Sequence, residues 1–235
     1  MSVACFIYGF RHQPSALGLR ALRNAGIEIG CIVAAPWRYL STAEPAAPAR
    51  WRRAETDDFA SIAPLYAVDH ADPRIAEIAA RHGCRLGVIL GARVLPRHAV
   101  AAFRDGVVNV HPGLAPWNRG LDSHKWAVAL DCAQGVTCHL VGARIDCGPL
   151  LLRRTLPAIG DCDLTAVRAR LSELALAVLV DGVGRSLSGA VRSIEDPWPY
   201  HTRMTAEAEQ SVNDKFEAYK SRYELLAERW AAHDC

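Results

Sequence analysis

The chain has 235 residues, of which 51% are hydrophobic, and its 27 Lys and Arg side chains nearly balance its 25 Asp and Glu side chains, for a net charge of +2. This length suffices for one main domain with a small appendage and is too short for two full domains. No block of basic residues resembles a nucleic-acid-binding arm, and no apolar run approaches the roughly 20 residues that span a bilayer. We therefore expect neither nucleic acid nor a membrane as a partner.

The eight cysteines occur singly along the chain, at Cys5, Cys31, Cys84, Cys132, Cys138, Cys147, Cys162 and Cys235. Because no C-x-x-C pair occurs, the spacing argues against a zinc knuckle, and we expect no bound metal. The apolar N-terminus lacks a basic leader and a cleavage pattern. These features favour a reducing cytoplasm with free thiols.

The first half of the chain alternates short apolar runs with helix-like stretches. The expected strands are Val3–Tyr8, Ile27–Ala34, Leu65–Val68, Leu86–Leu90 and Gly106–Val110, and the expected helices are Pro14–Ala25, Asp72–His82 and Pro96–Phe103. We expect Asp72 to be the N-cap of its helix and residues 36–64 to form a long loop or a short irregular helix. Strands that alternate with helices predict an α/β fold: a Rossmann-like, mainly parallel sheet with helices on both faces.

The second half continues with a predicted helix over Leu121–Leu130, strands over Val136–Val141 and Leu150–Thr155, and a helix from Asp163 to Leu187. Residues 1–190 are expected to form the catalytic domain and residues 191–204 a linker. Residues 205–235 have helical periodicity and are expected to form a short helical C-terminal extension. Its aromatic stripe favours packing or a dimer contact over a ligand platform, so a homodimer is one expectation.

Three polar groups follow predicted strands in the middle of the chain. Asn109 and His111 are two residues apart, so they emerge on the same face if the strand continues, and Asp146 lies in a turn between two strands. An Asn amide can donate to a developing oxyanion, and an imidazole that titrates near neutral pH can exchange a proton with an amine. Asp146 can orient His111 or collect the proton. The sequence thus predicts acyl transfer to an amine without a metal.

The strings around these groups resemble the folate-dependent formyltransferase family. The likeness is carried by Asn109-x-His111-Pro112-x-Leu114-x-Pro116, by Arg119-Gly120, and by His139-x-Val141-x-x-x-Ile145-Asp146-x-Gly148-Pro149. The resemblance implies 10-formyltetrahydrofolate as co-substrate and Asn109, His111 and Asp146 as the catalytic residues. It also implies direct attack of a substrate amine on the formyl carbon through a tetrahedral intermediate.

The same resemblance implies where the folate is bound. The backbone of one segment would line the pterin pocket, and a loop would close over the ring. The first segment comprises Leu90, Gly91, Ala92, Arg93, Val94 and Leu95, and the loop comprises Gly142, Ala143, Arg144 and Ile145. Arg144 and Cys147 depart from the residues that many relatives carry there.

The subclass follows from which family features the chain has and lacks. No glycine-rich phosphate cradle follows the first strand, and no C-terminal barrel of the tRNA-formylating relatives is expected. The string Pro116-Trp117-Asn118-Arg119-Gly120 is similar to one in nucleotide-sugar formyltransferases, so a nucleotide-linked amino sugar is the expected small-molecule acceptor. The expected acceptor contacts are Arg11, His12, Pro112, Gly113, Trp117, Asn118, Arg119, Gly120, His124 and Lys125.

Several interpretations stay open at this point. Arg11, His12, His124 and Lys125 either contact the substrate or are solvated, and we favour a packed role for His139 over a catalytic one. The acceptor could instead be an amino acid, a peptide-like intermediate or an aminated cyclitol. A third hypothesis is a folate- or nucleotide-binding protein without catalysis, against which the intact trio argues.

Overall fold

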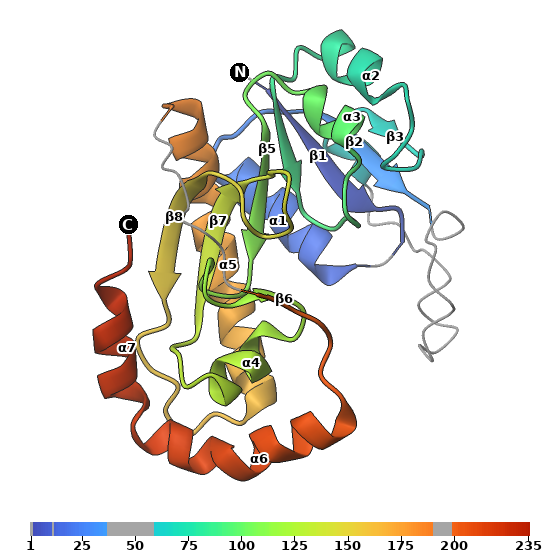
Figure 1. The fold of residues 1–235 in the computed structure, drawn as a ribbon. Coiled ribbons are helices and arrows are strands. Elements are labelled where there is room, and N and C mark those ends of the chain that lie inside the picture. The colour runs from blue at the N-terminus through green and yellow to red at the C-terminus, as the bar shows by residue number, and fades with distance from the viewer. Residues whose placement is uncertain (1, 11, 37–58, 190–198) are drawn as a thin grey trace. The chain divides into compact units, whose positions relative to one another are not determined.

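A computed structural model describes residues 2–10, 12–36, 59–189 and 199–235 (Figure 1). The chain divides into two compact units, Met1–Val108 and Asn109–Cys235, and each is described by itself. The seven strands of the large sheet follow the order β3-β2-β1-β4-β5-β7-β8, and strand β5 contributes residues to both units. The α/β class with a mainly parallel sheet, predicted from the alternating pattern, is confirmed.

The first unit contains the parallel part of the sheet. Its strands are β1 (Val3–Tyr8), β2 (Ile29–Ala35), β3 (Leu65–Tyr66), β4 (Leu86–Ile89) and the start of β5 (Val107–His111), and all of their pairings are parallel. Its helices are α1 (Gln13–Asn24), α2 (Ile75–Arg81), α3 (Arg97–Ala101) and a short 3-10 helix over Phe59–Ser61. The apolar runs that predicted these strands are buried, as expected for parallel strands covered by other elements.

The second unit holds the antiparallel edge of the sheet and the C-terminal helices. It contains the end of β5, β6 (Arg119–Gly120), α4 (Ser123–Ala129), β7 (Gly135–Leu140), β8 (Leu150–Thr155), α5 (Leu164–Leu187), β9 (Tyr200–His201), α6 (Ala206–Ser221) and α7 (Tyr223–Ala231). Strands β7 and β8 pair antiparallel, and the long helix α5 packs on both. Helix α6 packs on α4, and α7 packs on β8 (Figure 1).

Two local expectations were wrong, each for a physical reason. Asp72 does not cap α2, because its carboxylate accepts from the backbone N–H of Arg74 at 2.9 Å in a turn that precedes the helix. Helix α4 starts only at Ser123, because the N–H of Leu121 donates to the His201 carbonyl beside β6. The expected helical C-terminal extension is confirmed, and it consists of two helices that are interrupted at Arg222.

The C-terminal extension packs on its own unit through buried aromatic residues. Tyr219 and Tyr223 are each 1% exposed. The Tyr219 hydroxyl donates to the Cys132 carbonyl at 2.8 Å, and the Tyr223 hydroxyl donates to the Leu156 carbonyl at 2.7 Å. The stripe that predicted packing or a dimer contact is therefore largely used within the unit. Within the described residues, no helix is long and apolar enough to cross a membrane.

Candidate active site

The three groups singled out from the sequence lie together at the end of β5 and in the loop between β7 and β8. Asp146 is the centre of the group. Its Oδ2 lies 3.4 Å from the Nδ1 of His111 and accepts from the Gly120 N–H at 3.1 Å, and its Oδ1 lies 3.5 Å from the Asn109 Nδ2. An amide, an imidazole and a carboxylate thus share one partly buried site within the second unit.

Asp146 has an unusual backbone conformation, with φ of +49°. Asp and Asn adopt this left-handed region more readily than other non-glycine residues, yet it remains uncommon and costs free energy. The loop is also tight, because a Cβ on Gly148 would collide with the Leu140 carbonyl oxygen and lie 2.8 Å from the Gly142 nitrogen. The surrounding backbone therefore holds the carboxylate in one place.

His111 is anchored at one ring nitrogen. Its Nε2 lies 2.8 Å from the Asn118 carbonyl oxygen, which can only accept, so this nitrogen carries a hydrogen. The ring is 4% exposed. Nδ1 is left facing the Asp146 carboxylate at a distance longer than an ordinary hydrogen bond. In the neutral ring Nδ1 is a proton acceptor, and once it is protonated it can donate to Asp146.

The segment that carries the Asn118 carbonyl is held by several contacts. The Thr137 hydroxyl donates to the Gly113 carbonyl at 2.7 Å and accepts from the Ala115 N–H at 3.0 Å. The Asn118 side chain donates to the Ser123 carbonyl at 2.8 Å. Gly113 has no room for a side chain, because a Cβ there would lie 2.5 Å from the His111 Nε2.

His139 also belongs to this site. It is 2% exposed, and its Nε2 lies 3.2 Å from the Asn109 Nδ2 and 3.9 Å from Oδ1 of Asp146. Burial lowers the pKa of His139, against the opposing effects of the Leu140 carbonyl and the Asp146 carboxylate. The ring is therefore neutral at physiological pH and acts on Asn109 through its position.

The residues expected to contact the acceptor are found in different surroundings. Pro112 is exposed, while Asn118 and Arg119 are buried. Lys125 forms an ion pair with Glu209, and His124 accepts from the Gln134 side chain through its carbonyl oxygen. In the first unit, the His12 side chain accepts from the Ser15 N–H at the start of α1. Arg11 lies outside the described residues.

Several buried polar atoms near Arg119 have no hydrogen-bond partner among the described residues. They are Oδ1 of Asn118, Nε and Nη1 of Arg119 and Nε2 of His201. His201 belongs to β9, which pairs with β6, and its ring stacks on Trp126 with centroids 4.5 Å apart. Buried donors and acceptors of this kind are normally satisfied by water or a ligand. His201 lies in the expected linker, and no sequence pattern pointed to it.

The segments expected to bind folate lie in both units and are described separately. In the first unit, the Val94 side chain is 74% exposed, whereas Leu90 and Leu95 are buried. In the second unit, the Ile145 side chain is 44% exposed beside Asp146. An exposed apolar side chain beside Asp146, such as Ile145, is able to contact the face of a flat ring.

Comparison with known proteins places these residues in a family. The family model described as formyl transferase matches residues 38–183, more than half of the chain. A methionyl-tRNA formyltransferase from Aromatoleum aromaticum is 27% identical over 206 residues, which cover 84% of this chain and 63% of that protein. The chain therefore spans less than two thirds of the length of this curated relative.

Solved structures show the same fold at low sequence identity. Phosphoribosylglycinamide formyltransferase from Bacillus halodurans matches with a TM-score of 0.58 and 17% identity, covering 80% of this chain and 97% of that one. The formyltransferase PseJ from Anoxybacillus kamchatkensis, in complex with UDP-4,6-dideoxy-4-formamido-L-AltNAc and tetrahydrofolate, matches with a TM-score of 0.55 and 15% identity, covering 95% and 97%. With the family match over residues 38–183, these findings show that the chain belongs to the formyl transferase family.

Proposed function

We propose that this chain transfers the formyl group of 10-formyltetrahydrofolate to a primary amine on a nucleotide-linked amino sugar. The observation that carries the proposal is the position of the Asp146 carboxylate, with the His111 Nδ1 at 3.4 Å and the Asn109 Nδ2 at 3.5 Å. These are the groups that formyl transfer to an amine requires: a proton acceptor, a carboxylate that stabilises the resulting cation, and an oxyanion donor.

In the proposed reaction, the amine nitrogen forms a bond to the formyl carbon, and the carbonyl oxygen gains negative charge in a tetrahedral intermediate. The Asn109 amide donates a hydrogen bond to this oxygen, because its contact with Asp146 is long and weak. The amine loses a proton, and His111 accepts it at Nδ1, because the Nε2 of His111 is hydrogen-bonded to the Asn118 carbonyl. Asp146 stabilises the imidazolium.

The intermediate then collapses as the bond from the formyl carbon to the folate nitrogen breaks. His111 returns its proton from Nδ1 to that leaving nitrogen, so the ring ends the cycle as it began it. In the second unit, the exposed Ile145 side chain and the backbone of its segment would contact the folate. The folate supplies the activated formyl group, and the chain supplies position, charge and proton transfer.

Two findings support the nucleotide-linked acceptor. The string Trp117-Asn118-Arg119-Gly120 is similar to one in nucleotide-sugar formyltransferases, and the PseJ structure, which has the same fold, holds a UDP-linked formamido sugar and tetrahydrofolate. Arg119 adds a buried cation next to Gly120, whose N–H binds Asp146. The curated relatives formylate methionyl-tRNA, to judge by their names, so that acceptor belongs in the test.

The test is a transfer assay with 10-formyltetrahydrofolate and a panel of amines. The panel contains UDP- and dTDP-linked 3-amino and 4-amino sugars, the same sugars without nucleotide, amino acids, an aminocyclitol, methionyl-tRNA and glycinamide ribonucleotide. Release of tetrahydrofolate and the mass gain of one formyl group report the reaction, and His111→Ala serves as the blank. Formylation of a nucleotide sugar, and not of its free sugar, is expected. If only methionyl-tRNA is formylated, methionyl-tRNA replaces the nucleotide sugar as the proposed acceptor. If folate binds but no amine is formylated, the proposed enzymatic activity is refuted.

A further inference from the structure

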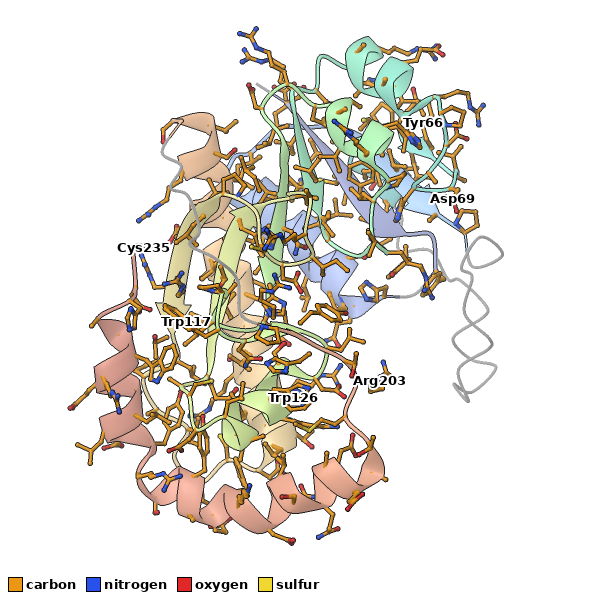
Figure 2. The ribbon with its side chains drawn as sticks, viewed as in Figure 1. Tyr66, Asp69, Trp117, Trp126, Arg203 and Cys235 are labelled. Carbon is orange, nitrogen blue, oxygen red and sulfur yellow. The ribbon has the colours of Figure 1, made fainter. Side chains whose placement is uncertain are left out.

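The C-terminal segment contacts the loop that holds His111. Trp117 lies between strand β8 and helix α7 (Figure 2). The Arg153 guanidinium carbon is 4.6 Å from the centre of the Trp117 ring, and the Trp230 ring meets it edge-on, with centroids 5.0 Å apart. The His233 ring lies 4.7 Å from it. One indole thus contacts a strand residue and two residues of the tail.

The tail itself is fixed to β8 by hydrogen bonds. The Asp234 carboxylate accepts from the N–H of Thr155 at 2.8 Å and from its hydroxyl at 2.9 Å. Arg153, whose guanidinium lies over Trp117, also donates to the His233 carbonyl at 3.0 Å. Asp234 therefore binds a backbone donor of β8, and a charge-assisted bond of this kind holds α7 and the residues after it in register with the strand.

Trp117 is one residue away from the group that anchors His111. The Asn118 carbonyl, which accepts from the His111 Nε2 at 2.8 Å, belongs to the residue that directly follows Trp117 in the chain. We expect a displacement of the Trp117 backbone to be passed on to this oxygen, because the two residues are joined by a peptide bond. Since Nδ1 is the nitrogen that faces Asp146, loss of the Asn118 contact would free the ring to turn or to change its tautomer.

We propose that the segment Tyr223–Asp234 is a positioning element of the active site, in which Trp230 and Asp234 hold Trp117 so that the Asn118 carbonyl keeps the hydrogen of His111 on Nε2. The proposal rests on the proposed function in that His111 is taken as the group that exchanges a proton with the amine. Trp230 and Asp234 touch neither substrate nor the reacting atoms, so they are positioning residues.

Two pairs of variants separate positioning from simple folding. Trp230→Ala removes the ring, whereas Trp230→Phe keeps an aromatic edge against Trp117. Asp234→Ala removes the acceptor for Thr155, whereas Asp234→Asn keeps one oxygen to accept from it. Leu225→Ala, on the same helix at a side chain that is 73% exposed, is the matched control. Thermal unfolding establishes that each variant is folded at the assay temperature.

Two readouts are measured for every variant. Steady-state kinetics should show kcat lowered about tenfold or more in Trp230→Ala and Asp234→Ala, because small displacements of catalytic groups have effects of that size, with a smaller change in the KM for folate. The conservative partners and Leu225→Ala should stay within about twofold of wild type. The pH profile of kcat should shift in the two alanine variants, since the environment of His111 changes. Within the described residues, the ionisable side chains that interact with His111 include Asp146 and His139.

The second readout does not need turnover. In ¹⁵N spectra of histidine-labelled protein, the His111 ring, assigned with His111→Gln, should show a hydrogen on Nε2 in wild type and a changed tautomer or exchange broadening in both alanine variants. Unchanged ring signals together with unchanged kcat in folded Trp230→Ala and Asp234→Ala would overturn the positioning role. If wild-type protein formylates no amine, the proposed function fails, and the ring signals still decide whether the tail positions His111.

Discussion

The Nε2 of His139 lies 3.2 Å from the Nδ2 of Asn109. Nδ1 of the same ring is 2.8 Å from the Leu140 carbonyl oxygen, to which it must donate. Because burial keeps this ring neutral, Nε2 carries only a lone pair and accepts a hydrogen from the Asn109 amide. His139 therefore sets which way the amide points, and it places the NH2 group on the side of Asp146.

We predict that His139→Phe lowers kcat about tenfold to a hundredfold, because the Asn109 amide loses the acceptor that orients it. His139→Gln should recover part of the rate, since an amide oxygen can accept in place of Nε2. Thermal unfolding of both variants controls for the loss of a packed side chain. A His139→Phe enzyme that is folded and has wild-type kcat would show that Asn109 does not need this partner.

Alanine at Asn109, His111 or Asp146 should each lower turnover by at least about a hundredfold, as expected for oxyanion and acid–base groups. Asp146→Asn should be nearly as slow, because it keeps an acceptor for the Gly120 N–H and loses the charge beside His111. Single-turnover formyl transfer with the best acceptor of the panel measures each variant.

Asp131→Asn is the matched control for Asp146→Asn. Asp131 also has a positive φ, of +55°, and its exposed carboxylate pairs with Arg222 on the surface. The two substitutions therefore make the same chemical change in a similar backbone conformation. If the Asp146 and Asp131 variants retained equal turnover, the carboxylate of Asp146 would have no part in the reaction.

The fold was largely predictable because most of its strands are marked by short, continuous patterns in the sequence. Buried parallel strands appear as continuous apolar runs, so the expected strand over Ile27–Ala34 overlaps β2 at Ile29–Ala35. Strands β6 and β9 could not be predicted, because each has two residues, and their pairing joins Arg119 to Tyr200 across about eighty positions. Such contacts arise from tertiary packing and leave no periodic pattern in the sequence.

The site was predictable in composition and less so in its contacts. The spacing of Asn109 and His111 predicted that they share a face, and the structure brings Asp146 within 3.5 Å of both. The anchoring of His111 by the Asn118 carbonyl was not predictable. Every residue has a backbone carbonyl oxygen, so the residue types do not indicate which of these oxygens accepts the hydrogen bond. The contact between Trp117 and Trp230 joins segments far apart in the chain.

Gly113→Ala should inactivate the enzyme more than it destabilises the fold. A Cβ at this position would lie 2.5 Å from both the His111 Nε2 and the Asn118 carbonyl oxygen, so the hydrogen bond between them has to open. We expect kcat to fall by about tenfold to a hundredfold. Gly184→Ala is the control, because a Cβ there, in the last turn of α5, meets nothing within 4 Å and should leave the helix intact. Equal activities in the two variants would contradict the anchoring role of Asn118.

Acid should destabilise the protein partly through His124. Burial, together with the positive charges of Arg168 and Lys125, lowers the pKa of His124 from 6.5 to about 4. The unfolded chain takes up a proton at this residue near pH 6.5, whereas the folded chain does so only near pH 4. The unfolded state thus binds more protons in this window, so the free energy of unfolding falls as the pH is lowered from 6.5 towards 4 and is unaffected by His124 above it.

Denaturant unfolding at pH 7.5, 5.5 and 4.5 checks this contribution. His124→Gln should lose less stability than wild type between pH 7.5 and 4.5, because the group whose protonation favours unfolding is gone. His98→Gln, which removes an exposed imidazole that hydrogen-bonds to the Ala71 carbonyl, controls for the loss of a histidine as such. Parallel pH profiles for wild type and His124→Gln would show that the pKa of His124 is the same in the folded and unfolded states. The packing of α4 would then not hinder protonation of the His124 ring.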